Sequence, residues 1–107
     1  MKKETLIIAR HYGLEHQLEK QLEELEELHE ATRFLLKITR SASFATPTGQ
    51  QALTHYCEEV ADVNIMIDQN NFLLGGDTLK QIDAWRKFKV ARQLRRIADE
   101  IERETIK

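Results

Sequence analysis

Hydrophobic residues recur every three or four positions along most of the chain, which is the spacing of amphipathic helices rather than of strands. Glycines and capping residues divide this pattern into four predicted helices, at about residues 4–12, 14–40, 47–74 and 78–104. Gly13 and the Gly75-Gly76 pair are typical helix ends, and Thr46 before Pro47 is a typical helix start. We therefore predict an all-α fold, with four helices in a bundle-type protomer.

The second predicted helix distributes its acidic residues over different faces. On a wheel of 100° per residue, Thr32 and the leucines at 14, 18 and 36 lie within about 20° of Leu25, so this stripe is expected to face the core. Glu23, Glu26 and Glu30 fall on the side expected to be solvated. Glu24 falls on the other side, among apolar residues, and is the acid that we expect to be partly buried, with Glu27 one turn further along.

The third predicted helix carries a second acidic pair. Glu59 and Asp62 are three residues apart and therefore share a face. The segment that follows, residues 63–67, is apolar nearly all round, which predicts that this helix lies inside the bundle. Carboxylates beside such a segment are costly unless a partner compensates their charge. A divalent cation would compensate both pairs, and ligands that are all oxygen favour Mg²⁺ or Mn²⁺ over Zn²⁺.

Composition and charge narrow the class of protein. The chain has 107 residues, enough for one small domain over residues 1–107, and it is 41% hydrophobic and 32% charged. These values argue against a disordered chain and against a membrane-spanning one. The net charge of −2 argues against a partner that is a nucleic-acid polymer. Residues 15–30 nevertheless contain seven glutamates and one lysine, whereas residues 86–96 contain six lysines or arginines and no acid. These two segments either hold a metal-bound anion between them or attract each other.

The cysteine content bears on the compartment. Cys57 is the single cysteine, so no internal disulfide is possible, and a buried, unreactive thiol in the reducing cytoplasm is expected. The N-terminal residues show no signal-peptide pattern. Four slender helices would leave apolar surface to cover, which predicts a homo-oligomer.

The two acidic pairs and their flanks resemble a known family. Glu23-Glu24-x-x-Glu27 followed by Glu59-x-x-Asp62 is similar to the paired motif of the MazG-like all-α nucleoside triphosphate pyrophosphohydrolases, a superfamily that includes the dimeric dUTPases. The flanks that match are Tyr12-Gly13, Gln17-Leu18, Ile65-Met66-Ile67 and residues 88–92, so the resemblance covers roughly residues 10–97. Glu26-Glu27-x-x-Glu30 also fits the first half of the motif. The earlier register is preferred because Glu24, rather than Glu30, lies beside apolar neighbours.

The resemblance implies an activity and a set of site residues. Members of this family use Mg²⁺ to hydrolyse nucleoside triphosphates to nucleoside monophosphate and pyrophosphate, and they are dimers or tetramers. Carried over by position, the implied metal ligands are Glu24, Glu27, Glu59 and Asp62, and the implied catalytic residues are Glu23 and Glu24. Lys89 and Arg92 are implied as contacts to the substrate phosphates, with ion pairing to the acidic helix as the alternative.

Several alternatives stay open at the level of the sequence. A ferritin-like di-iron protein needs Glu-x-x-His on two helices, and only Glu26-x-x-His29 occurs. A phosphoribosyl-ATP pyrophosphohydrolase would use similar metal chemistry on another substrate, and a helical scaffold would use none. His11, Tyr12 and Phe34 are candidates for stacking on a base. His29 is expected to be packed, and Trp85 is expected in the core or in a subunit interface.

Overall fold

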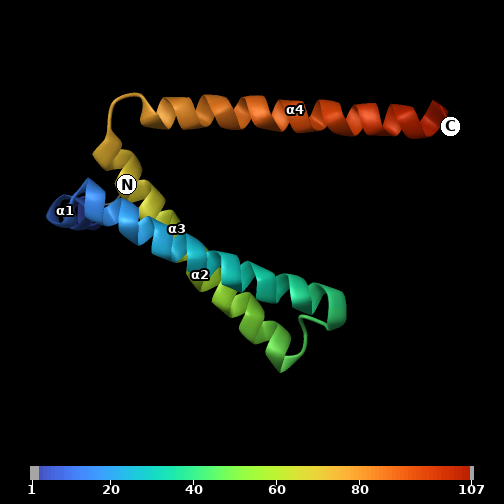
Figure 1. Ribbon diagram of the computed structural model, residues 1–107, viewed down its shortest axis with the longest axis horizontal. Coiled ribbons are helices and arrows are strands. Elements are labelled where there is room, and N and C mark those ends of the chain that lie inside the picture. Colours follow the sequence, from blue (N-terminus) through green and yellow to red (C-terminus); the bar gives the residue numbers. More distant parts are fainter. Residues whose placement is uncertain (1–2, 107) are drawn as a thin grey trace. The chain divides into compact units, whose positions relative to one another are not determined.

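The computed structural model describes residues 3–106, and every regular element in this range is a helix. The helices are α1 (Lys3–Tyr12), α2 (Leu14–Ser41), α3 (Pro47–Leu74) and α4 (Thr78–Ile106) (Figure 1). The predicted all-α fold with four helices is confirmed, and each predicted boundary lies within two residues of the observed one. The chain divides into two units, one containing α1–α3 and one containing α4. That the whole chain works as one domain stays a prediction.

Local chemistry explains the turns that join α1, α2 and α3. Gly13 separates α1 from α2 with a φ of 83°, a left-handed conformation that residues other than glycine rarely adopt. Before α3, the Thr46 hydroxyl accepts a hydrogen bond from the Gly49 N–H at 3.0 Å, which is the predicted N-cap. Gly49 itself is buried against the backbone of Ser43 and Phe44, so closely that a Cβ atom would overlap it. The Thr46 hydrogen bond and the close contact of Gly49 with the loop backbone together hold the loop before α3 in place.

The core of the first unit is a seam between α2 and α3, which lie side by side and antiparallel (Figure 1). The buried residues of α2 recur every seventh position, at Gln17, Glu24, Ala31 and Ile38. Those of α3 follow a similar period, at Gly49, Ala52, Glu59, Val63, Met66, Gln69 and Asn70. A period of seven is the pattern of helices that wind around each other as a coiled coil. α1 adds Ala9 to this core, and the Arg10 guanidinium lies 5.2 Å from the centre of the Phe72 ring.

The leucine stripe predicted to face the core does not form the seam. Leu18, Leu25 and Leu36, which we call the leucine face of α2, are 39%, 40% and 46% exposed. The seam runs beside this face instead, along the line of Gln17, Glu24, Ala31 and Ile38. The apolar arc of α2 is thus wider than the part that α3 covers. Two smaller predictions were also wrong, since His29 and Cys57 are exposed rather than packed.

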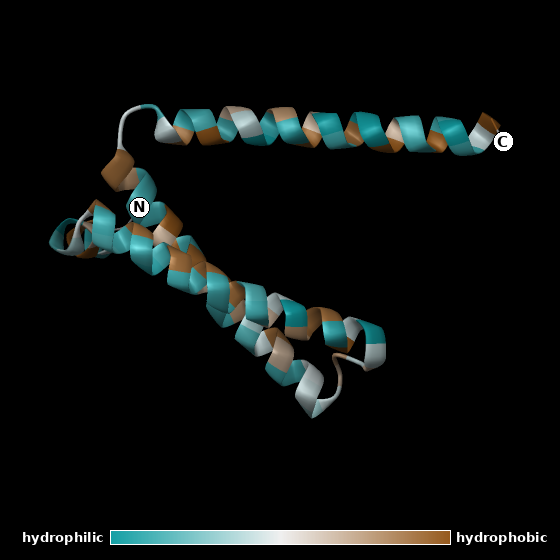
Figure 2. Ribbon diagram, viewed as in Figure 1, coloured by the Kyte–Doolittle hydropathy of each residue, from teal (hydrophilic) through white to brown (hydrophobic). Residues whose placement is uncertain are grey.

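The second unit is the single helix α4. None of its described residues is buried. Trp85 is 58% exposed, so it is not buried in a core, and its place in a subunit interface stays a prediction. Hydrophobic and hydrophilic residues alternate along the whole length of α4 (Figure 2). Among the helices described between residues 3 and 106, none is both long enough and apolar enough to cross a membrane.

Candidate metal centre

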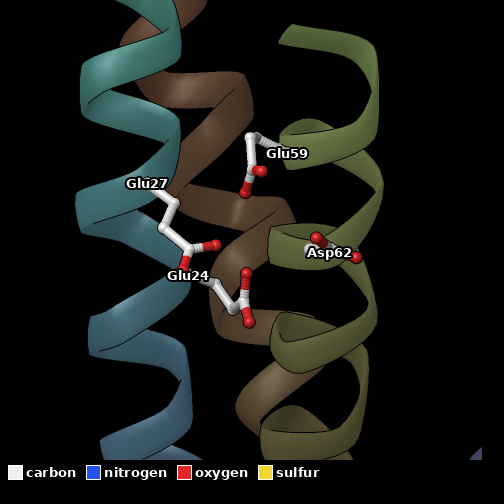
Figure 3. Close-up of side chains that lie close together, drawn as sticks. All are labelled: Glu24, Glu27, Glu59 and Asp62. Atoms are coloured by element: carbon white, nitrogen blue, oxygen red, sulfur yellow. The ribbon is translucent and has the colours of Figure 1, made fainter. Parts of the chain in front are cut away.

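The seam brings together the four carboxylates that the sequence singled out. Glu24 and Glu27 come from consecutive turns of α2, and Glu59 and Asp62 come from consecutive turns of α3. One carboxylate oxygen of each lies within 4.8 Å of one oxygen of every other. Figure 3 shows Glu24 and Glu27 pointing from α2 toward α3, and Glu59 pointing back toward α2. We call these four side chains the carboxylate cluster.

Two members of the carboxylate cluster occupy positions of the seam that apolar residues fill elsewhere. Glu24 and Glu59 are each only 7% exposed, whereas Glu27 and Asp62 are exposed. One oxygen of Glu24 (Oε2) and one of Glu59 (Oε2) are buried without a hydrogen-bond partner among the residues that the structure describes. An unpartnered buried carboxylate oxygen is costly, so both oxygens would be stabilised by a bound cation.

The environment of Glu24 disfavours its charged form. Burial raises the pKa of Glu24, and hydrogen bonding to Glu27 and the charges of Glu27 and Asp62 raise it further. Lys20 opposes this rise, because its ammonium lies 3.4 Å from Glu24 and 3.3 Å from Glu23. The same two contacts raise the pKa of Lys20. Sequence reasoning missed Lys20, although its spacing of four residues from Glu24 was a usable signal.

The donor set agrees with a hard divalent cation. In the part of the chain that the structure describes, the carboxylate cluster contains oxygen ligands alone, which suits Mg²⁺ or Mn²⁺. His55 approaches one edge, with Nδ1 3.8 Å from Oε1 of Glu59, but it is not a member of the group. His29 is elsewhere, accepting a hydrogen bond from Arg33 at 2.9 Å. The Glu26-x-x-His29 pair that a di-iron site would need therefore lies outside the cluster.

A cavity of about 580 Å³ adjoins the carboxylate cluster, a size within the range of small-molecule sites. Glu23, Glu24 and Asp62 form part of its wall, together with Lys20. A second part of the wall is aromatic, because the rings of Tyr12 and His16 are stacked with their centres 4.6 Å apart. Of the three predicted stacking residues, Tyr12 lines this cavity and His11 and Phe34 do not. His16 was not predicted.

Three buried amide side chains lie near this aromatic wall, and two of them, Gln17 and Gln69, line the cavity. Gln17, Gln69 and Asn70 are each at most 3% exposed. The Gln17 amide donates to the Gln69 carbonyl oxygen, and the Asn70 amide donates to the Gln17 backbone carbonyl at 3.0 Å and to Gln21 at 2.7 Å. The side-chain oxygen of Asn70 has no hydrogen-bond partner within residues 3–106. Sequence reasoning missed this network, because its members are about fifty residues apart in the chain.

The other predicted site residues are distributed as follows. Glu23 is exposed at the rim of the cavity, whereas Glu26 and Glu30 lie outside the carboxylate cluster, as the earlier motif register predicts. Lys89 and Arg92 belong to α4, the second unit, where the Arg92 guanidinium lies 5.8 Å from the centre of the Phe88 ring. Their contact with substrate phosphates stays a prediction.

Comparison of the chain with protein-family models, with curated proteins and with solved structures finds no match. The similarity to the MazG-like motif therefore remains a resemblance between short stretches of sequence. The functional conclusion rests on the geometry of the carboxylate cluster and of the cavity beside it.

Proposed function

We propose that this protein is a Mg²⁺-dependent nucleoside triphosphate pyrophosphohydrolase, which releases nucleoside monophosphate and pyrophosphate from ribo- or deoxyribonucleoside triphosphates. The observation that carries the proposal is the convergence of four carboxylates from two helices, two of them buried with unpartnered oxygens. The paired acidic motif adds support, because these are the residues that it implies as ligands. In this proposal Mn²⁺ can replace Mg²⁺, and the enzyme is a cytoplasmic homo-oligomer, a dimer or a tetramer, whose partner is the nucleotide.

The carboxylate cluster fits the cation by charge and by donor type. Glu24, Glu27, Glu59 and Asp62 would hold it, and the buried oxygens of Glu24 and Glu59 would gain the partner that they lack. A bound Mg²⁺ would supply charge neutralisation for the triphosphate and would lower the pKa of the attacking water. The protein's own task is then to position the substrate, which is the larger part of catalysis in phosphoryl transfer.

Two further side chains beside the cluster have roles in this proposal. Lys20 is the cationic side chain that lines the cavity, so we assign it to an anionic phosphate of the substrate. Glu23 lies at the cavity rim, where Lys20 contacts it at 3.3 Å. Its exposed carboxylate can accept a hydrogen bond from the attacking water and can orient that water for attack on the α-phosphorus.

The cavity provides room for the nucleoside. The stacked rings of Tyr12 and His16 offer an aromatic surface, and the amides of Gln17 and Gln69 offer polar groups nearby. A mainly apolar cavity with a few fixed polar groups is typical of a site for a planar, polar-edged ligand. The nucleobase is the part of a nucleotide with this chemistry.

The products of the reaction test the proposal directly. The full chain is incubated with Mg²⁺ and a panel of nucleoside triphosphates, deoxynucleoside triphosphates and phosphoribosyl-ATP, and the products are separated by ion-exchange chromatography. Monophosphate with pyrophosphate is the expected pair. Diphosphate with inorganic phosphate would place the attack at another phosphorus and contradict the proposal. No turnover of any substrate would favour the non-catalytic scaffold, and turnover of phosphoribosyl-ATP alone would favour the related enzyme.

A further inference from the structure

The second unit carries an apolar stripe with no cover of its own. Val90, Leu94, Ile97 and Ile101, which we call the α4 stripe, are spaced four, three and four residues apart and are 49%, 62%, 51% and 58% exposed. This is the spacing of positions that face a partner in a coiled coil. Isolated helices are marginal in water, so a helix with such a stripe needs a partner surface.

Small residues run along one flank of the α4 stripe. Ala84, Ala91 and Ala98 recur every seventh position, and Thr105 continues the series. Small side chains beside an apolar stripe allow two helix axes to approach closely. Val90, Ala91 and Leu94 lie together on this side of α4, next to charged residues of the preceding turns. The small side chains therefore leave room for another helix beside the α4 stripe.

We propose that α4 pairs with α4 of a second copy of this chain, in antiparallel orientation. One register places Val90 level with Ile101 of the partner subunit, and Leu94 level with Ile97 of the partner subunit. By symmetry each of these layers occurs twice, so the register has four apolar layers. The next position outward places Lys87 level with Glu104 of the partner subunit. Both ends of the apolar segment are then closed by an opposite-charge pair.

Charge complementarity favours a second copy of α4 as the partner and favours the antiparallel orientation. Residues 86–96 contain six lysines or arginines and no acid, whereas residues 99–104 contain four acids and one arginine. Antiparallel pairing places each basic segment beside an acidic one, whereas parallel pairing would place Lys87 against Lys87 and Glu104 against Glu104. Within one chain, Lys87 contacts Asp83 at 3.1 Å, but this pair is exposed and contributes little.

Cysteine cross-linking tests both the pairing and its direction. In full-length chains with Cys57→Ser, Ala84→Cys and Thr105→Cys are introduced separately, and the two variants are mixed and mildly oxidised. In the proposed register these positions lie on one flank, within about 3 Å of each other along the helix axis. A disulfide between the two different variants is expected, and little within either variant alone. Self-linked Ala84→Cys chains would show parallel pairing, and no link in the mixture would show that α4 has another partner; either result overturns the proposal.

Charge reversal provides a second, independent test with the same readout. Lys87→Glu and Glu104→Lys are each expected to lower the cross-linking yield by about tenfold, because like charges then meet at both ends. The two reversals in one chain restore the opposite-charge pairs and are expected to restore the yield. Matched controls are Arg96→Glu and Asp99→Lys, which lie on the opposite face of α4 and should leave the yield unchanged. A double variant that fails to link, while both controls link normally, overturns the proposed register.

Discussion

The two units of this protein use the seven-residue pattern in opposite ways. In the seam between α2 and α3, Glu24 and Glu59 occupy buried positions of this pattern. Charged side chains are therefore buried there. In α4 the positions of the seven-residue pattern are occupied by the α4 stripe, whose apolar residues are exposed. In the seam, α2 and α3 cover each other, and carboxylates replace apolar side chains at two of the buried positions. α4 carries exposed apolar residues at coiled-coil spacing, and we propose that a second copy of α4 covers them.

This contrast teaches that burial and hydrophobicity report different properties here. A buried acid with an unpartnered oxygen is the basis for the proposed cation site, whereas an exposed apolar stripe is the basis for the proposed pairing of α4. The carboxylate cluster and the α4 stripe can therefore be perturbed separately.

Replacement of Glu59 by glutamine is expected to have the largest effect on activity. The substitution keeps the size of the side chain but removes a charged, buried ligand, so Mg²⁺-dependent pyrophosphate release should fall by about a hundredfold or more. Helix content, measured by circular dichroism, should stay near that of the wild type. Glu30→Gln, on α2 but outside the carboxylate cluster, is the matched control. Equal activity in the two variants would remove the proposed metal site.

The α4 stripe can be broken without touching the carboxylate cluster. Leu94→Asp places a charge in two of the four proposed apolar layers and is expected to lower α4 cross-linking by about tenfold or more. Binding of Mg²⁺ to the cluster, measured by isothermal titration calorimetry, should be unchanged. Loss of metal binding in this variant would show that the two units depend on each other.

Replacement of Lys20 by methionine tests a residue that sequence reasoning missed. Removal of the ammonium should raise the KM for the triphosphate by about tenfold, because one charge-assisted contact is lost. Lys37→Met, an exposed change further along α2, is the control. An unchanged KM in Lys20→Met would restrict Lys20 to neutralising the cluster in the absence of a cation.

The smallest expected effect concerns the stability of the metal-free protein. Burial, with the neighbouring carboxylates, raises the pKa of Glu24, so the folded chain holds a proton on Glu24 more tightly than the unfolded chain does. The free energy of unfolding should therefore fall as the pH rises from the ordinary carboxyl range through the raised pKa. Glu24→Gln does not ionise, so its stability should depend less on pH and should exceed that of the wild type near neutrality.

Urea unfolding in the presence of EDTA, from mildly acidic to neutral pH, measures this difference. Added Mg²⁺ should reverse the order of the two proteins, because a cation at a hundred times its Kd stabilises the wild type by about 2.7 kcal/mol and has no complete site in Glu24→Gln. If both proteins gained equal stability from Mg²⁺, the cation would bind elsewhere.

The sequence predicted the features that depend on nearby residues. The helix ends followed from Gly13 and Thr46, whose conformation and hydrogen bonds are local. The carboxylate cluster was predictable because two acids three residues apart must share a helical face, and the apolar flank of Glu24 showed which face is buried. The amide network was not predictable, since the partner of Gln17 lies 52 residues away. The seam was misplaced because α2 has a wider apolar arc than α3 covers.

The buried amides have a consequence for how the two long helices are aligned. Two antiparallel helices with a seven-residue pattern can slip by one repeat and still bury similar side chains, a shift of about 10 Å. Such a slip would carry Glu59 beyond the reach of Glu24 while leaving the apolar contacts nearly intact. The bonds that Gln17 makes with Gln69 and Asn70 are lost in every slipped arrangement. Gln69→Leu should therefore weaken cation affinity without altering a single carboxylate, because the amides keep the two halves of the site opposite each other.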